Sequence, residues 1–190
     1  MTQIDCSTWK DISMERYWEI NGNLDDEESG LKNYPLFKQA VCIVKTMFDQ
    51  AFGAELLYKI KFYVDNATAD SGYTPIATVV LKQIVIIKLG IASNDPFDKI
   101  IFQFAHELMH VVFRAIWGID KPHANDTEEG ICTAAALIAV KIICPEKFDA
   151  YYAHIKELTN PGYHSGAYIA ENAQYSLHHL LPLVQSIQYF

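Results

Sequence analysis

The run His-Glu-Leu-Met-His at residues 106–110 has the residue types and the spacing of a zinc-binding motif. On a helix His106 and His110 are four residues apart, so their imidazoles lie one above the other, as two ligands of one zinc ion require. Glu107 lies beside them, where its carboxylate can reach a water molecule bound to the metal and act as a general base. This pattern predicts a zinc site with a catalytic carboxylate.

The stretch 93–118 is expected to form the helix that carries these residues. Asn94 or Asp95 can cap its start, Pro96 suits its first turn, and Gly118 can end it. Apolar residues surround nearly the whole helix, so we expect it to be buried. Its polar residues form one stripe at three- and four-residue spacing, which is poorer in lysine than a solvated face would be. These are Gln103, His106, Glu107, His110 and Arg114.

A catalytic zinc ion takes three protein ligands, so a third must follow the motif helix. Glu129, with 18 residues between it and His110, is one candidate, and His123, with 12 residues between, is its rival. Glu129 also fits a capping box that starts at Asp126, and could instead cap its own helix. A carboxylate left uncompensated beside a buried helix is costly, which favours Glu129 as a ligand. Glu128 is expected to be a solvated first-turn residue.

Hydrophobic periodicity predicts the elements around the motif. Apolar residues repeat at helical spacing before and after the motif helix. Short β-branched runs lie between the first of these helices and the motif helix. The two later strands form either a hairpin or one bent strand, and Pro182 bends or ends the last helix. Helices are expected at 35–52, 126–143, 145–158 and 165–187, and strands at 58–64, 76–81 and 84–89. The order gives an α+β fold: a small β-sheet, the buried HExxH helix, a glutamate helix and a helical C-terminal part.

Length and composition bound the class of protein. The 190 residues include 51% hydrophobic residues, enough for a single domain at 34–190 with an N-terminal extension, 1–33, that packs on it. A net charge of −8 makes nucleic acid and anionic membrane poor electrostatic partners. No signal peptide or membrane span is visible, so we expect a cytoplasmic protein unless it is exported by a leaderless route. The four cysteines lack CxxC or disulfide-framework spacing and are expected to be buried thiols.

An HExxH motif followed after 18 residues by Glu-Gly resembles the gluzincins, the thermolysin and aminopeptidase group of zinc metallopeptidases. The resemblance is good over Phe104–Ala136 and extends loosely over Pro35–Ile143, and the chain is similar in size to a minimal single-domain member. The metzincin extension is ruled out, because Phe113 and Ile116 stand where it needs glycine and histidine.

The resemblance implies a zincin-like fold and assigns roles to individual residues. His106, His110 and Glu129 would be the zinc ligands. Glu107 would be the general base and later the proton shuttle, and Gly130 would let the second helix approach closely. A peptide substrate commonly pairs with an edge strand above the metal in this family, for which 76–81 or 84–89 would serve.

The chain departs from the family pattern at two points. Thermolysin-like members orient the first histidine with an aspartate four residues after the ligand glutamate, and here that position is Thr133. The tyrosine or histidine that stabilises the oxyanion also has no obvious match, and its candidates are more typical of packing residues. They are Tyr151, Tyr152, Tyr163, His164, Tyr168 and Tyr175.

The function expected from these features is a zinc-dependent peptidase acting on peptide or protein substrates, without nucleic-acid or membrane partners. One alternative is a protein on the same fold that binds zinc without catalysis and serves in interactions. Another is a metal-free helical binding module in which the motif is accidental. The oligomeric state has no signature in the sequence.

Overall fold

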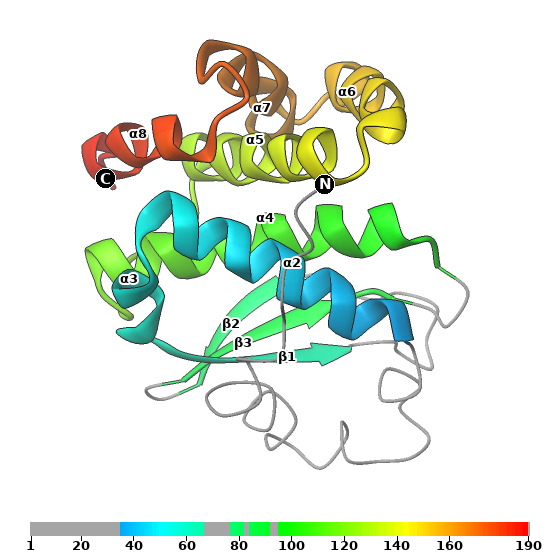
Figure 1. The fold of residues 1–190 in the computed structure, drawn as a ribbon. Helices are drawn as coiled ribbons and strands as arrows, with labels where there is room; N and C mark the ends of the chain where they lie inside the picture. The colour runs from blue at the N-terminus through cyan, green and yellow to red at the C-terminus, as the bar shows by residue number, and fades with distance from the viewer. Residues whose placement is uncertain (1–34, 67–76, 82–83, 92–94, 190) are drawn as a thin grey trace.

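The computed structural model describes residues 35–66, 77–81, 84–91 and 95–189 (Figure 1). The expected N-terminal extension, 1–33, lies outside these residues. The chain runs through α2 (Pro35–Phe52), α3 (Ala54–Tyr58), β1 (Lys61–Asn66), β2 (Ala77–Leu81), β3 (Ile84–Leu89), α4 (Phe97–Trp117), α5 (Asp126–Ile143), η3 (Pro145–Lys147), α6 (Phe148–Glu157), α7 (Pro161–Asn172), η4 (Leu177–Leu180) and α8 (Leu181–Ser186).

The predicted α+β class is wrong, because the described part of the chain is mostly helical. Three short strands form a small sheet beside the helical body (Figure 1). The sequence prediction gave the sheet too much weight for a physical reason. Runs of β-branched residues predict individual strands. The relative share of sheet and helix in the fold depends instead on how many helices pack together.

The small sheet has the order β1-β3-β2. β2 and β3 pair antiparallel, as the predicted hairpin requires, while β1 pairs with β3 in parallel. Because β3 is paired on both sides, residues 84–89 do not form an edge strand, which leaves 76–81 of the two alternatives. The strand predicted at 58–64 begins only at Lys61, since residues 54–58 form a helical turn after Gly53.

Helix α4 lies in the middle of the molecule, between α2 and the sheet on one side and α5 on the other (Figure 1). Its side chains from Ile100 to Phe113 are buried except for Phe102, which explains why the helix is apolar nearly all round. Helix α5 packs in turn against α7, so it is also covered on both faces. The two helices that carry the motif and Glu129 are therefore held inside the helical body.

The ends of α4 and α5 differ in part from the sequence prediction. Pro96 is the N-cap of α4 instead of its first residue, and no side chain caps this end. Asp95 forms an ion pair with Lys99 at 2.6 Å, and Asn94 lies outside the described residues. Gly118 ends the helix as predicted, with a φ of 99°.

The C-terminal part is more broken than periodicity predicted. The helix expected at 145–158 is divided into η3 and α6. The one expected at 165–187 is divided into α7, η4 and α8, because Gln174 and Tyr175 take positive φ angles of 53° and 54° that no continuous helix allows. The chain then turns back toward the end of α4.

Two expectations about the setting of the chain can be compared with the structure. Within the described ranges, no helix combines the length and the apolar character needed to cross a membrane. Cys132 and Cys144 are buried free thiols, as expected. Cys42 is disulfide-bonded, so the expectation of thiols is wrong at this position.

Candidate metal centre

Helices α4 and α5 bring His106, His110 and Glu129 together. The Nε2 atom of His106 lies 3.2 Å from Oε2 of Glu129, and Nε2 of His110 lies 3.7 Å from Oε1 of the same carboxylate. The two imidazole rings are 5.2 Å apart at their centroids. One candidate ligand atom from each of the three side chains lies within 4.8 Å of the other two. Three residues that the sequence singled out thus converge on one point.

Glu129 is placed there by the close packing of α5 on α7. A Cβ atom at Gly162 would lie 3.0 Å from Cβ of Glu129, and one at Gly166 would lie 2.6 Å from Cβ of Thr133. Gly130, expected to allow a close approach between helices, faces Gly162 and Ser165 of α7. Because these glycines lack side chains, the backbones of α5 and α7 can pack closely together. This packing positions the part of α5 that carries Glu129.

The donor set fits a divalent cation. Oε2 of Glu129 is buried and has no hydrogen-bond partner among the described residues, although Nε2 of His106 is only 3.2 Å away. Such an orphaned oxygen is costly unless a cation completes it. Burial raises the pKa of Glu129, but the two imidazoles outweigh this effect and the pKa is lowered, so the carboxylate is ionised at neutral pH. Two imidazoles and one carboxylate are a donor set typical of zinc.

The expectation of Glu128 as a solvated residue is wrong, because its side chain is fully buried. Its Oε1 accepts a hydrogen bond from Nδ1 of His110 at 2.7 Å. Its Oε2 accepts from Nζ of Lys121 and from the hydroxyl of Tyr189, each at 2.6 Å. Asn125 is the N-cap of α5 and accepts from the Glu128 amide, so the alternative of a capping box from Asp126 to Glu129 is not formed. Glu128 therefore orients His110 so that Nε2 faces Glu129.

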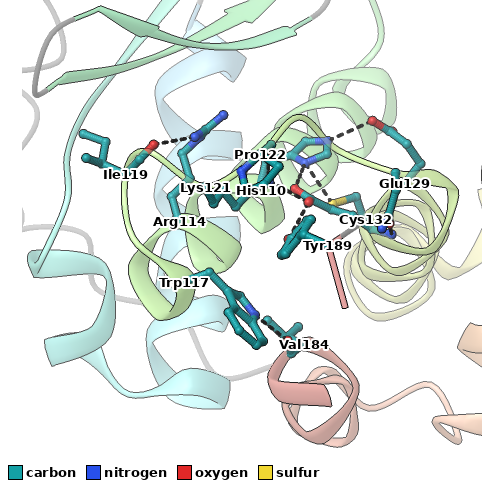
Figure 2. Close-up of polar contacts among 12 residues, drawn as sticks. His110, Arg114, Trp117, Ile119, Lys121, Pro122, Glu129, Cys132, Val184 and Tyr189 are labelled. Carbon is teal, nitrogen blue, oxygen red and sulfur yellow. Dashed lines mark hydrogen bonds and ion pairs between the residues drawn. The ribbon is translucent and has the colours of Figure 1, made fainter. Parts of the chain in front are cut away.

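Electrostatics support this arrangement. Burial raises the pKa of Glu128 and lowers that of His110, but the hydrogen bond between them, together with the neighbouring charges and hydrogen bonds, reverses both effects. The pKa of Glu128 is thus lowered and that of His110 raised. Burial and the bond to Glu128 raise the pKa of Tyr189, so its hydroxyl stays protonated and donates a hydrogen bond to Glu128. Figure 2 shows Lys121, Cys132 and Tyr189 gathered beside His110.

A second group of potential ligands, His110, Glu128 and Cys132, lies behind the first. Sγ of Cys132 is 3.4 Å from Nδ1 of His110, but burial raises the pKa of this thiol well above its ordinary value. Lys121 and Tyr189 already occupy one oxygen of Glu128. This group therefore supports His110 and is poorly suited to hold a cation of its own.

His106 has a different environment. Among the described residues no carboxylate hydrogen-bonds its Nδ1, and Thr133, at the position of the family aspartate, has a buried hydroxyl without a partner. The ring of Tyr163 lies 5.9 Å from the His106 ring. Of the aromatic candidates for an oxyanion-stabilising role, Tyr163 is the one whose ring is found against His106 among the described residues.

Two cavities meet at His106, Glu107 and Tyr163. One, of about 190 Å³, is polar and contains the three converging side chains together with Arg114 and Lys121. The other, of about 370 Å³, is mainly apolar and lies between α4 and α6. Its apolar lining is Phe102, Tyr151, Ile155 and Leu158. Glu107 is itself buried, with an exposure of 3%, and faces both cavities.

The sequence identified the converging residues but missed their support. His123, the rival third ligand, is exposed at the rim of the polar cavity and joins neither group of potential ligands. Lys121 and Tyr189 carried no signal, since a lysine in a loop and a tyrosine 61 residues beyond Glu128 have no local pattern. The N-cap preference of Asn125 was a signal that could have identified the residue that caps α5.

Comparisons of the chain with protein-family models, with curated proteins and with solved structures give no match.

Proposed function

We propose that the protein is a zinc-dependent metallopeptidase of the gluzincin type. The observation that carries this proposal is the convergence of the His106 and His110 imidazoles on the Glu129 carboxylate. One oxygen of that carboxylate, Oε2, is buried and has no hydrogen-bond partner among the described residues. A second supporting observation is the position of Glu107, which follows the proposed ligand His106 and faces both cavities. A glutamate of another helix beside both imidazoles favours a metal site over an accidental motif.

In this mechanism Glu107 is the general base. A bound zinc ion would polarise the scissile carbonyl and lower the pKa of water. Glu107 removes one proton from the attacking water, whose oxygen forms the new bond to the carbonyl carbon. It then passes that proton to the amide nitrogen as the C–N bond breaks, so one peptide and one water give a carboxylic acid and an amine. Burial of Glu107 keeps bulk water from competing for this proton.

Tyr163 is suited to donate a hydrogen bond to the carbonyl oxygen of the substrate. Its ring lines both cavities and lies beside His106, on the side where a substrate carbonyl would approach the cation. A phenolic hydroxyl donates to an oxygen that gains negative charge in the transition state, which is the usual role of such a group.

The apolar cavity provides room for a substrate side chain. Its volume of about 370 Å³ exceeds the ~150 Å³ of an engineered cavity that holds benzene, so a large apolar or aromatic residue fits. It adjoins His106 and Glu107, so that residue would lie next to the scissile bond. β2 lies at one end of the sheet and is the hairpin strand that can pair with an extended peptide.

The test is a Glu107→Gln variant assayed against a peptide library and for zinc content. We expect zinc to stay bound and turnover to fall by at least ~100-fold, the scale that general-base catalysis contributes. Glu157→Gln, the same change on the exposed face of α6, is the matched control and should keep full activity. Undiminished cleavage by Glu107→Gln would remove this residue from the mechanism.

The alternative of a zinc-binding interaction protein without catalysis rests on Thr133. Its hydroxyl has no hydrogen-bond partner within the part of the chain that the structure describes, and in thermolysin-like members the residue at this position orients the first histidine. The same assay separates the two functions, because this alternative predicts bound zinc and no cleavage in the wild-type chain.

A further inference from the structure

We propose that Lys121 and Tyr189 are positioning residues for the metal centre and that the segment 184–189 acts through them on cation affinity. The inference rests on the proposed binding of a cation by His106, His110 and Glu129. It does not depend on peptidase activity. It assigns a role to a stretch of chain that lies far from the motif in sequence.

The first step is the geometry of the Glu128 carboxylate. Its two oxygens are divided: Oε1 faces His110, and Oε2 faces Lys121 and Tyr189. The last torsion of a glutamate has a broad, shallow preference, so one bond to His110 would leave the carboxylate free to rotate. Two donors on the second oxygen stop this rotation. The direction of the His110 ring is fixed as a consequence.

The second step is the charge. Glu128 is fully buried, and Lys121 is the cation that contacts it directly, at 2.6 Å. A buried carboxylate with a cation and two further hydrogen bonds is well compensated. The Nζ atom of Lys121 also lies 4.9 Å from the centre of the Tyr189 ring and donates to the carbonyl of Pro122. Lys121 and Tyr189 therefore hold each other as well as Glu128.

The third step is the attachment of the segment 184–189. Nε1 of Trp117 donates to the carbonyl of Val184 at 2.8 Å, and Nδ2 of Asn125 donates to the carbonyl of Gln188 at 3.2 Å (Figure 2 shows the first). The rings of Trp117 and Tyr189 meet edge to face at 5.8 Å. The end of α4 and the cap of α5 thus both hold the segment that delivers the Tyr189 hydroxyl.

A Tyr189→Phe variant tests this inference, because it removes only the hydroxyl and keeps the ring against Trp117 and Lys121. Loss of an outer hydrogen-bond partner commonly weakens metal binding by about 10–100-fold, and we expect about 3–10-fold for a residue one bond further away. Zinc affinity is measured by competition with a chelator. Tyr152→Phe is the matched control, since its hydroxyl bonds Glu171 away from both cavities and its loss should leave affinity unchanged.

Two more measurements separate positioning from general stability. The visible spectrum of the cobalt-substituted protein reports ligand geometry, and it should change in Tyr189→Phe but remain as in wild type for Tyr152→Phe. In a Glu128→Gln background, the Tyr189→Phe change should have no further effect on zinc affinity, because both act through one carboxylate. Fully additive losses would contradict a common route through Glu128.

The outcomes also distinguish this inference from the proposed function. Equal zinc affinity and equal cobalt spectra for wild type and Tyr189→Phe would overturn the inference alone. Weaker zinc binding by Tyr189→Phe in a chain without peptidase activity would support the inference and contradict the proposed catalysis. A wild-type chain that takes up neither zinc nor cobalt would overturn both.

Discussion

His106 and His110 lie one turn apart on the same helix, and yet the protein holds them in different ways. His110 belongs to a buried polar network of Glu128, Lys121 and Tyr189, drawn from three separate parts of the chain. His106 faces Glu129, the Tyr163 ring and the apolar cavity. The two histidines of the proposed ligand pair are therefore held by different surroundings.

This difference indicates a division of tasks. On the His110 side, buried hydrogen bonds fix the imidazole before a cation arrives, which reduces the ordering needed on binding. On the His106 side, the neighbouring space is open and apolar, and it adjoins Glu107. Substrate binding and catalysis are expected on the His106 side, and retention of the metal is expected to depend on the His110 side.

The largest expected effect comes from breaking the His110 side. A Glu128→Gln variant keeps the size of the side chain but removes the charge that compensates Lys121, and we expect zinc affinity to fall about 10–100-fold. Chelator competition measures it, with Glu157→Gln as the surface control. Affinity equal to wild type would show that the network gives His110 no advantage over His106.

A smaller effect is expected from filling the apolar cavity on the His106 side. Leu158 lines it near the end of α6, and Leu158→Trp should reduce kcat/KM for peptides with a large apolar residue at the scissile bond about 10-fold. Peptides with alanine there should be much less affected, and zinc affinity should not change. The exposed Leu183→Trp is the control. An equal loss for both peptides would exclude this cavity as the side-chain site.

The pH dependence of stability in the metal-free chain sharpens the comparison further. The pKa of Glu128 is below its ordinary value of 4.5, so its stabilisation is present above that value and lost as pH falls through the folded pKa. The pKa of His110 is above its ordinary value of 6.5, so its stabilisation is present below that value and lost as pH rises through the folded pKa. Denaturant unfolding measured across the pH range should show that both losses of stability, at low pH and at rising pH, are smaller in Glu128→Gln than in wild type. The same pH dependence in both proteins would contradict the coupling between Glu128 and His110.

The smallest effect is expected at Thr133. Its hydroxyl is buried and has no partner in the described ranges, so Thr133→Val replaces a polar atom at nearly constant shape and should raise the free energy of unfolding by up to ~1 kcal/mol. Zinc affinity should stay within about twofold of wild type, since nothing polar is lost from His106. A clear fall in affinity would show that Thr133 orients His106 after all.

Local patterns account for what the sequence predicted. Residues 35–52 and 126–143 are helices at the predicted bounds. Their hydrophobic periodicity and the residues that end them are local features of the sequence. The convergence of Glu129 with the two histidines was implied by the resemblance to the gluzincins, whereas the spacing left His123 open as a rival. The support by Lys121 and Tyr189 could not be predicted, since it depends on the chain turning back at Gln174 and Tyr175 and on glycine-mediated packing of α5 on α7.

The measurement that tests the central claim most directly is the zinc content of the purified chain after equilibration with a limited excess of zinc. Convergence of His106, His110 and Glu129 on one cation predicts one zinc ion per chain in wild type and in Glu107→Gln, and loss of that ion in Glu129→Ala. Zinc bound equally well by wild type and Glu129→Ala, or by neither, would contradict it.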